Sequence, residues 1–508
     1  MTAQSLLLNR FLTRIEVIGN RLPHPTLLFI YLCGFILALS WLCAWLGVGA
    51  LHPVNGNTVS AVNLLNAEGL QRILANTVTN FTQFAPVGTV LVAIMGIGVA
   101  EHSGLLGAVL RATVIKAPAK LLTFTIVLAG VLSSLAADTG YVVLIPLAAM
   151  IFAAVGRSPV VGIAAAFAGV SGGYSANLLI GPLDAILAGI STEAARLVEP
   201  GYEVSAAGNY YFILASTFMI AAVGTWVTER WIEPRFPHDG TNASGVEALK
   251  PYEKRALKLV GAFSLVFVGL LLWGLIPETG ALRHPETGSI LRSPFIKGIV
   301  TIIAVYAALA GLLYGKVSGN FRRGQDFVLG MEKSMATMAS YLVLMFFAAQ
   351  FVSYFGWSQL GIIAAINGAE VLQQLQLNTA SLLVGFVLLA AMINLLVGSA
   401  SAKWALIAPV FVPMLLLTGI SPEATQVAYR IGDSATNIIT PLMPYFGVVV
   451  AFVQQYDKQA GIGTIVAAML PYSVMFIVAW SLLLMAWILL GLPLGPGAEI
   501  FVGSGQAS

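Results

Sequence analysis

Charged residues are scarce in this sequence. Asp, Glu, Lys and Arg make up 9% of its 508 residues, whereas hydrophobic residues make up 58%; soluble proteins carry roughly 25% charged residues. Apolar stretches of about 18 residues or more, each long enough to cross a bilayer, recur from Leu27 to Leu492. The composition therefore excludes a soluble protein. It predicts an all-α polytopic membrane protein, with 1–508 as a single integral membrane domain in contact with the lipid bilayer.

Cysteine and histidine are rare as well. Cys33 and Cys43 lie on one apolar segment, about 15 Å apart if it is helical, which is too far for a disulfide. The five histidines lie in loops or at segment ends, so none is placed as the base of an intramembrane serine protease. A Walker A motif is also missing, because 311–317 has the wrong spacing and no Ser or Thr after its lysine. We therefore expect neither an enzyme nor an ATP-driven pump, and no bound cofactor.

The net charge of +3 is not gathered into a basic stripe, so no nucleic acid is expected as a partner. The loops 229–258 and 316–334 are rich in Lys and Arg, which places them in the cytoplasm by the positive-inside rule. The first loop also holds proline and glycine, which favour an exposed linker. It predicts a cytoplasmic linker at about 230–257 between two repeat halves, at about 68–230 and 330–490.

Two parts of the chain are apolar yet dense in Gly, Ser, Asp, Asn and Pro: 133–146 with 169–184, and 394–409 with 430–444. Four residues of the first half recur with the same spacing in the second, namely Pro146, Gly156, Ser158 and Pro159, matched by Pro409, Gly419, Ser421 and Pro422. Non-helical backbone at membrane depth occurs where protein buries it or where it lines a wet cavity. Paired interruptions of this kind are typical of the binding site of a secondary transporter. The alternative is that small residues only allow close helix packing.

Ionisable residues inside apolar segments are costly and usually face a cavity or a partner; here they are Asp138, Asp184, Lys403, Arg430 and Asp433. Arg430 and Asp433 are three positions apart, so they lie near one helical face with Asn437. The sequence predicts that Arg430 contacts Asp433 while its planar fork binds a substrate carboxylate. The alternative is a purely structural ion pair.

Hard oxygen ligands gather in the same region. Asn394, Asp433 and Asn437, with Ser399 and Ser401, predict a sodium site, because amide, carboxylate and freed carbonyl oxygens coordinate sodium in transporters. The first half offers an equivalent set: Ser133, Ser134, Asp138 and Asn177. Two alternatives stay open: each Ser or Asn could bond only to nearby backbone, and the aspartates could carry protons instead of holding sodium.

Trp404 follows the second polar hairpin, and Pro422 begins the segment that carries Arg430. An aromatic face beside an arginine suits an aromatic carboxylate, by stacking on its ring and pairing with its charge. A tryptophan at the membrane interface is the alternative interpretation of Trp404.

Several long blocks carry a family resemblance over nearly the whole chain, among them "GNRLPHPTLLFIYL" (Gly19 to Leu32), "SANLLIGPLDAILAGIST" (Ser175 to Thr192) and "SASAKWALIAPVFVPM" (Ser399 to Met414). These blocks resemble the AbgT family of p-aminobenzoyl-glutamate transporters. The resemblance implies an inverted-repeat ion-transporter-type fold with about nine transmembrane helices and two re-entrant hairpins per subunit. It also implies a homodimer in the bacterial inner membrane, in which the hairpins and broken helices move together against a dimerisation scaffold.

The resemblance also implies roles for individual residues. It implies substrate binding by Asp184, Ser401, Trp404, Pro422, Arg430 and Pro441, with Asn394 and Asp433 as sodium contacts. The expected function is secondary transport of p-aminobenzoyl-glutamate or related aromatic carboxylates, coupled to sodium or protons. The alternatives are a proton-driven exporter of p-aminobenzoate and sulfonamides and, less favoured because no ring of charges is evident, a channel.

Overall fold

The computed structural model describes residues 25–51, 57–115, 118–135, 140–236, 249–290, 293–440, 443 and 445–503. Within these ranges the fold is helical, apart from a small antiparallel hairpin of β1 (Gly49–Leu51) and β2 (Thr58–Ser60). Eight helical stretches are long and apolar enough to cross a membrane, and five shorter apolar helices accompany them. The predicted class, an all-α polytopic membrane protein, is confirmed.

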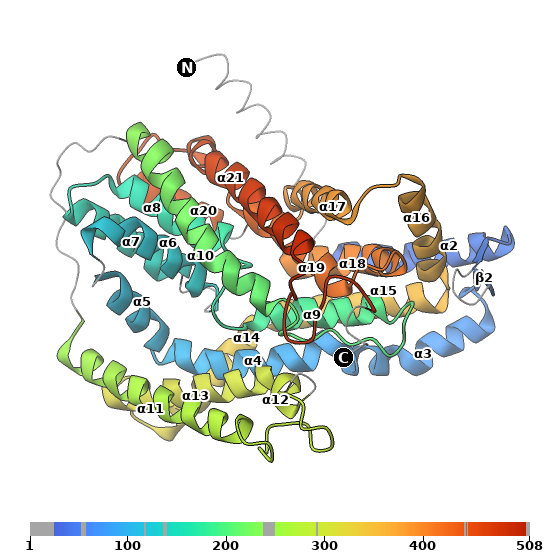
Figure 1. Ribbon diagram of the computed structural model, residues 1–508, viewed down its shortest axis with the longest axis horizontal. Helices are drawn as coiled ribbons and strands as arrows, with labels where there is room; N and C mark the ends of the chain where they lie inside the picture. The colour runs from blue at the N-terminus through green and yellow to red at the C-terminus, as the bar shows by residue number, and fades with distance from the viewer. Residues whose placement is uncertain are drawn as a thin grey trace.

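One group of helices is built on α4 (Ala85–His102): α13 (Ile299–Ser318) and α14 (Gly324–Thr337) pack on α4, and α11 (Pro251–Leu275) and α12 (Pro294–Lys297) pack on α13. Figure 1 shows part of this group along the lower edge of the molecule. Four further helices extend this group toward the right-hand end of the molecule in Figure 1. They are α2 (Pro25–Trp45), α3 (Ala67–Thr82), α15 (Ala339–Trp357) and α16 (Leu360–Gln374).

A second group consists mainly of short helices and gathers around α10 (Tyr210–Val227) and α21 (Ile462–Leu489) (Figure 1). It contains α5 (Leu105–Ile115), α6 (Leu122–Ser133), α7 (Ile145–Ala154), α8 (Pro159–Phe167) and α20 (Phe446–Gln454). Two π-helical turns, η2 (Gly140–Leu144) and η3 (Ala168–Gly172), join this group to the polar segments. Such turns widen the helix locally and are frequent at functional sites.

Four helices between the two groups carry the predicted site: α9 (Pro182–Ala195), α17 (Thr379–Asn394), α18 (Ala400–Leu417) and α19 (Pro422–Asn437). Helix α19 is polar in sequence, yet all of its residues are buried. It starts at Pro422 because Ser421 caps it, the serine hydroxyl accepting a hydrogen bond from the Ala424 N–H. A polar helix buried on every side must be held by hydrogen bonds and ion pairs from its neighbours.

The polar segments interrupt helices as the sequence predicts. Helices α17 and α18 join through the short turn 395–399, and Ser399 caps α18 by accepting from the Ala402 N–H. In the first half, α6 ends at Ser133, and the tip that follows includes residues outside the described part of the chain. The repeat halves at 68–230 and 330–490 stay a prediction. Within the proposed linker, helical structure runs to Arg235 and begins again at Pro251.

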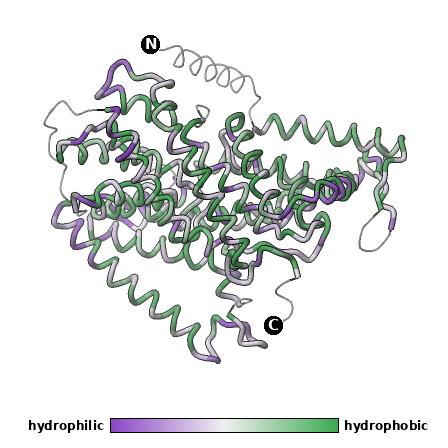
Figure 2. Tube along the Cα trace, turned by 45° about the horizontal axis from the view of Figure 1, so that its top comes forward, coloured by the Kyte–Doolittle hydropathy of each residue, from purple (hydrophilic) through white to green (hydrophobic). Residues whose placement is uncertain are grey.

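Hydrophobic side chains cover the outer faces of the helices. Leu74, Leu265 and Trp273 are each more than 70% exposed, and Figure 2 shows hydrophobic residues along most of the trace, with hydrophilic ones mainly near helix ends and in loops. Exposed apolar surface on this scale indicates a face covered by another phase. Lipid is the phase that fits helices of this length.

Helices α17 and α19 approach each other closely at Gly432. A Cβ added there would collide with the Val387 carbonyl oxygen and lie 2.7 Å from the Ala391 nitrogen. We expect Gly432→Ala to lower the free energy of unfolding by about 1–3 kcal/mol, because the two helices must separate. The measurement is chemical denaturation of the purified protein in detergent.

Gly385→Ala is the matched control for Gly432→Ala. Gly385 lies on α17, is exposed, and would place its new Cβ at least 4 Å from other atoms. Alanine is a better helix former than glycine, so this change should be neutral or stabilise by up to about 1 kcal/mol. Equal effects of the two substitutions would contradict the close approach at Gly432.

Candidate functional site

A buried ion pair links α9 to α19. Arg430 Nη1 donates to Asp184 Oδ1 at 2.6 Å, and the two side chains are 5% and 6% exposed. Asp184 lies in the first turn of α9, where its second oxygen accepts the Gly181 N–H at 2.7 Å. The start of a helix favours a negative charge, because its backbone N–H groups are unpaired. The carboxylate is therefore fixed before it meets the arginine.

Arg430 has donors that Asp184 does not use. Its Nη2 donates to the Ser175 carbonyl oxygen at 3.2 Å, while its Nε has no hydrogen-bond partner in the described part of the chain. Ser175 belongs to the non-helical segment that follows η3. The arginine thus keeps one donor free although it is nearly fully buried.

A second buried ion pair links α18 to α19. Lys403 Nζ lies 2.5 Å from Asp433 Oδ1, and each side chain is 1% exposed. The same ammonium donates to Asn394 Oδ1. The amide nitrogen of Asn394 shares its two hydrogens among three acceptors within 2.9 Å, namely the Asp433 carbonyl, the Thr436 hydroxyl and Asn437 Oδ1. The oxygens of Asn394 and Asp433 therefore converge on one positive charge, which is supplied by Lys403.

The predicted contact between Arg430 and Asp433 is wrong. Arg430 reaches α9 and pairs with Asp184, while Asp433 faces α18 and pairs with Lys403. The two residues share a helix, but α19 is enclosed on every side, so neighbouring turns meet different helices. Sequence spacing could not reveal this because both partners come from distant parts of the chain.

The other residues predicted to bind sodium divide into two sets. In the second half, Asn437 Oδ1 accepts from Asn394, and the Ser399 and Ser401 hydroxyls lie 3.4 Å apart. In the first half, the Ser133 and Ser134 hydroxyls bond to the Gly130 and Val131 carbonyls, as the backbone-bonding alternative expects. Asn177 contacts Ser134, and its oxygen accepts two backbone N–H groups. Asp138 lies outside the described residues.

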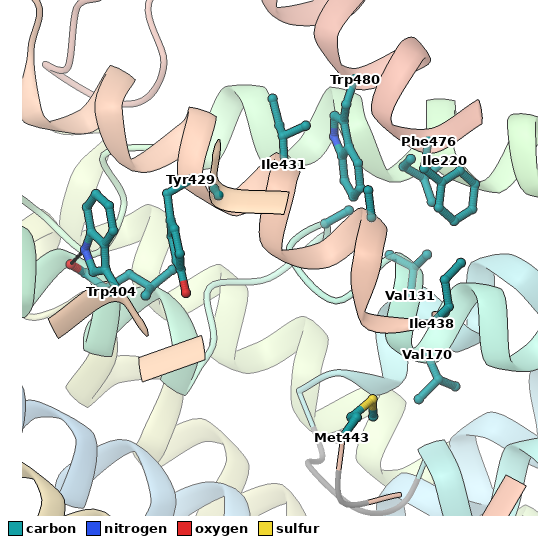
Figure 3. Packing of buried hydrophobic residues seen from close by; sticks show 14 of the residues in the cluster. Val131, Val170, Ile220, Trp404, Tyr429, Ile431, Ile438, Met443, Phe476 and Trp480 are labelled. Carbon is teal, nitrogen blue, oxygen red and sulfur yellow. Dashed lines mark hydrogen bonds between the residues drawn. The ribbon is translucent and has the colours of Figure 1, made fainter. Parts of the chain in front are cut away.

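Trp404 is fully buried, so it is not an interfacial residue in this structure. Its ring stacks on Tyr429 with centroids 4.5 Å apart, as Figure 3 shows. Its Nε1 donates to the Ser191 hydroxyl at 3.0 Å and to the Leu187 carbonyl at 3.2 Å. For Trp404 to stack on a substrate ring through this face, Tyr429 would have to move. Pro422 is the first residue of α19, as predicted, and Pro441 lies outside the described residues.

Sequence reasoning missed a buried chain of polar side chains that begins at Trp404. Ser191 donates to Gln426, and Gln426 donates to Asn209. Asn209 donates to the Glu423 backbone carbonyl, and the Glu423 side chain accepts from the Tyr202 hydroxyl. Glu423 follows Pro422 directly on α19, with Gln426 on the same helix, so an ionisable residue next to a predicted site proline was the signal available in the sequence.

A cleft of about 1060 Å³ lies between the α4 group and α9. Its wall includes Ala185, which follows Asp184, and its floor includes Glu423. The α4 side of the cleft includes Thr89 and Val300. Neither Asp184 nor Arg430 is among the described residues that line this cleft; α19 contributes Glu423 to it and α9 contributes residues from Ala185 onward. The structure thus places a cleft of small-molecule size between the α4 group and α9, and two buried ion pairs deeper in the molecule.

Comparisons with known proteins agree along nearly the whole chain. Residues 10–502 match the model of the family described as "AbgT putative transporter family". The chain is 38% identical over 484 residues to the p-aminobenzoyl-glutamate transport protein of Escherichia coli (strain K12), covering 95% of each. This relative and the family are described as transporters, and no enzymatic family is indicated.

Two solved structures share the fold. The crystal structure of the YdaH transporter of Alcanivorax borkumensis, reported to have an unusual topology, is 51% identical with a TM-score of 0.88, covering 93% of this chain and 100% of that chain. The structure of Neisseria gonorrhoeae MtrF, reported to illuminate a class of antimetabolite efflux pumps, is 47% identical with a TM-score of 0.90, covering 96% of this chain and 100% of that chain.

Proposed function

The chain belongs to the AbgT transporter family, and we propose that it is a secondary active transporter of p-aminobenzoyl-glutamate or related aromatic carboxylates. The observation that carries this proposal is Arg430, a buried arginine whose Nε has no hydrogen-bond partner among the described residues. Arginine binds carboxylates through its planar fork. The 38% identity to a p-aminobenzoyl-glutamate transport protein supports this substrate class.

In this proposal the aromatic residues and Asp184 complete the substrate site. Trp404 stacks on the substrate ring once Tyr429 has moved from it, and Asp184 accepts from the arylamine or takes part in proton transfer. Ser401 and Pro422 contribute from the first turns of α18 and α19, and the family resemblance implies a contribution from Pro441 as well. The broken helices and hairpins move as a unit against the α4 group in a homodimer, in the bacterial inner membrane.

Sodium is the coupling ion that the donor set favours. Asn394 and Asp433 already direct side-chain oxygens at a single positive charge, that of Lys403. Carboxylate and amide oxygens suit sodium as well as an ammonium group. Sodium would occupy the place of the lysine ammonium, with Asn437 nearby. Protons carried by Asp184 or Asp433 are the alternative coupling.

The second candidate function is export of p-aminobenzoate and sulfonamide antimetabolites, driven by the proton-motive force. The observation that favours it is the 47% identity to MtrF, a protein described as an antimetabolite efflux pump. Import and export need the same site but opposite gradients, so a flux measurement separates them.

The deciding measurement is flux of labelled p-aminobenzoyl-glutamate and p-aminobenzoate in proteoliposomes. A sodium gradient and a pH gradient are imposed separately, with protein-free liposomes as the control. We expect the sodium gradient alone to drive accumulation of p-aminobenzoyl-glutamate. Movement driven only by the pH gradient, with p-aminobenzoate preferred, would support the exporter instead. Uncoupled flux along the substrate gradient alone would contradict both and indicate a channel.

A further inference from the structure

Three residues at the Asp184–Arg430 pair and beside it each carry a buried polar atom without a partner, and all three line one small void. The atoms are Nε of Arg430 and the hydroxyls of Ser175 and Ser216, and none has a hydrogen-bond partner among the described residues. All three residues line the same void, and they are 4%, 5% and 1% exposed. A buried polar group without a partner costs about 1–3 kcal/mol. Three such groups at one place indicate a site for a ligand.

The Ser216 hydroxyl lacks the side-chain hydrogen bond that the threonine hydroxyls of the same helix make. On α10, Thr217 and Thr225 donate to the carbonyl four residues earlier, as Thr228 does just after the helix ends. This local bond is the usual way to satisfy a hydroxyl in a membrane helix. The Ser216 hydroxyl does not make it, although the same type of carbonyl lies within its reach. Because Ser216 lines the void, a ligand held there would give this unpaired hydroxyl its partner.

The size and the lining of the void limit the kind of ligand that it can hold. Its lining includes Arg430, Ser175 and Ser216, which carry the three unpaired polar atoms, and its remaining wall is apolar, including Phe212, Ile431 and Trp480; Figure 3 shows Ile431 and Trp480 near each other. It measures about 10 Å³, at the lower limit of what one water molecule requires. A site of this size and lining would take a single hydrogen-bond-accepting oxygen atom, which belongs either to a water molecule or to an anion.

The arginine's contacts show how an anion would enter. Nη1 is engaged by Asp184 and Nη2 by the Ser175 carbonyl, so the Nε side of the guanidinium is the part that faces the void. Nε and Nη2 together form the side edge of the arginine fork, which binds a carboxylate through two parallel N–H donors. A carboxylate at this edge would displace the weaker contact with the Ser175 carbonyl and leave Asp184 in place.

We propose that Arg430 Nε, Ser175 and Ser216 form an oxyanion subsite, which holds a water oxygen before substrate binds and one substrate carboxylate oxygen afterwards. The proposal rests on the proposed function, that aromatic carboxylates are the substrates. It assigns two specificity residues, Ser175 and Ser216, and it lets Arg430 bind substrate and Asp184 at the same time. The two serines discriminate a carboxylate from a neutral group, because each adds a hydrogen bond to a charged oxygen.

The test is equilibrium binding of labelled p-aminobenzoate to the purified full-length protein in detergent, with p-aminobenzamide as the neutral competitor. Ser216→Ala and Ser175→Ala should each weaken p-aminobenzoate binding about tenfold, since a hydrogen bond to a charged group contributes about that factor. The affinity for p-aminobenzamide should change less than about twofold. Thermal stability should stay at or above the wild-type value, because a buried hydroxyl without a partner is being removed.

Ser481→Ala is the matched control, because the Ser481 hydroxyl is also buried and without a partner in the described chain, yet Ser481 does not line the void. It should bind p-aminobenzoate as the wild type does. If the wild type binds p-aminobenzoate and both serine variants keep its affinity, the void holds only water and the subsite is overturned while the proposed function stands. If the wild type binds neither p-aminobenzoate nor p-aminobenzoyl-glutamate, both the proposed function and the proposed subsite are overturned.

Discussion

The Lys403→Met variant is expected to lose about 3–5 kcal/mol of its free energy of unfolding. Removing one partner of a buried ion pair leaves the other charge without compensation, and that is the source of the cost. Here both Lys403 and Asp433 are 1% exposed, and the ammonium also satisfies Asn394 Oδ1. Denaturation of the purified protein in detergent, followed by tryptophan fluorescence, measures the loss.

Two further variants separate a lost ion pair from general damage. The double variant Lys403→Met/Asp433→Leu should recover most of the stability, since replacing a whole buried pair by apolar groups is often neutral. Arg196→Met is the exposed control, because Arg196 is 41% exposed where it meets Glu193 and such a pair contributes about 1 kcal/mol or less. A Lys403→Met variant as stable as Arg196→Met would refute the structural importance of the pair.

The same variant also tests the proposed sodium ligands. Without the ammonium, the oxygens of Asn394 and Asp433 face one another with no cation between them. A ligand that binds only the folded state stabilises it by mass action. Sodium chloride should therefore raise the melting temperature of Lys403→Met more than that of the wild type, with potassium and choline chloride as controls. If the three salts change the melting temperature of Lys403→Met equally, Asn394 and Asp433 do not bind sodium.

The second large effect is expected at Arg430. Arg430→Lys should weaken p-aminobenzoate binding by roughly 30-fold or more, because losing the interactions of a buried charge costs about 2 kcal/mol or more. A lysine keeps the positive charge, but it cannot contact Asp184, the Ser175 carbonyl and a substrate carboxylate through one planar group. Equilibrium binding to the purified protein gives the change directly, without the transport cycle.

Controls for Arg430 must account for the fold. Asp184→Asn keeps the size of the Asp184 side chain while removing its charge, so its melting temperature shows how much of the Arg430→Lys effect is structural. Arg111→Lys changes an arginine of α5 that is paired with Glu253 of α11, 29% and 11% exposed, and should leave binding unchanged. If Arg430→Lys is folded and binds p-aminobenzoate with wild-type affinity, the carboxylate is bound elsewhere.

The sequence singled out the charges that the structure buries in α19, but it paired them wrongly, for identifiable reasons. Arg430 and Asp433 stood out because charge is rare in apolar segments, and both are buried in α19. Lys403 stood out for the same reason but received no role, because nothing in the sequence joined it to Asp433. Ser216 gave no signal, since a single serine in an apolar helix is ordinary and only its missing hydrogen bond makes it notable.

The sequence by itself determined that this chain is a polytopic membrane protein, that polar segments interrupt its helices, and which family it resembles. These follow from composition, from local breaks in apolar runs and from long blocks of residues, all of which are properties of neighbouring positions. The tertiary structure alone decided that Asp184 pairs with Arg430 and Lys403 with Asp433, and that three unpaired polar atoms share one void. Those facts depend on which helices surround α19, and a buried charge takes whichever partner the packing brings within reach.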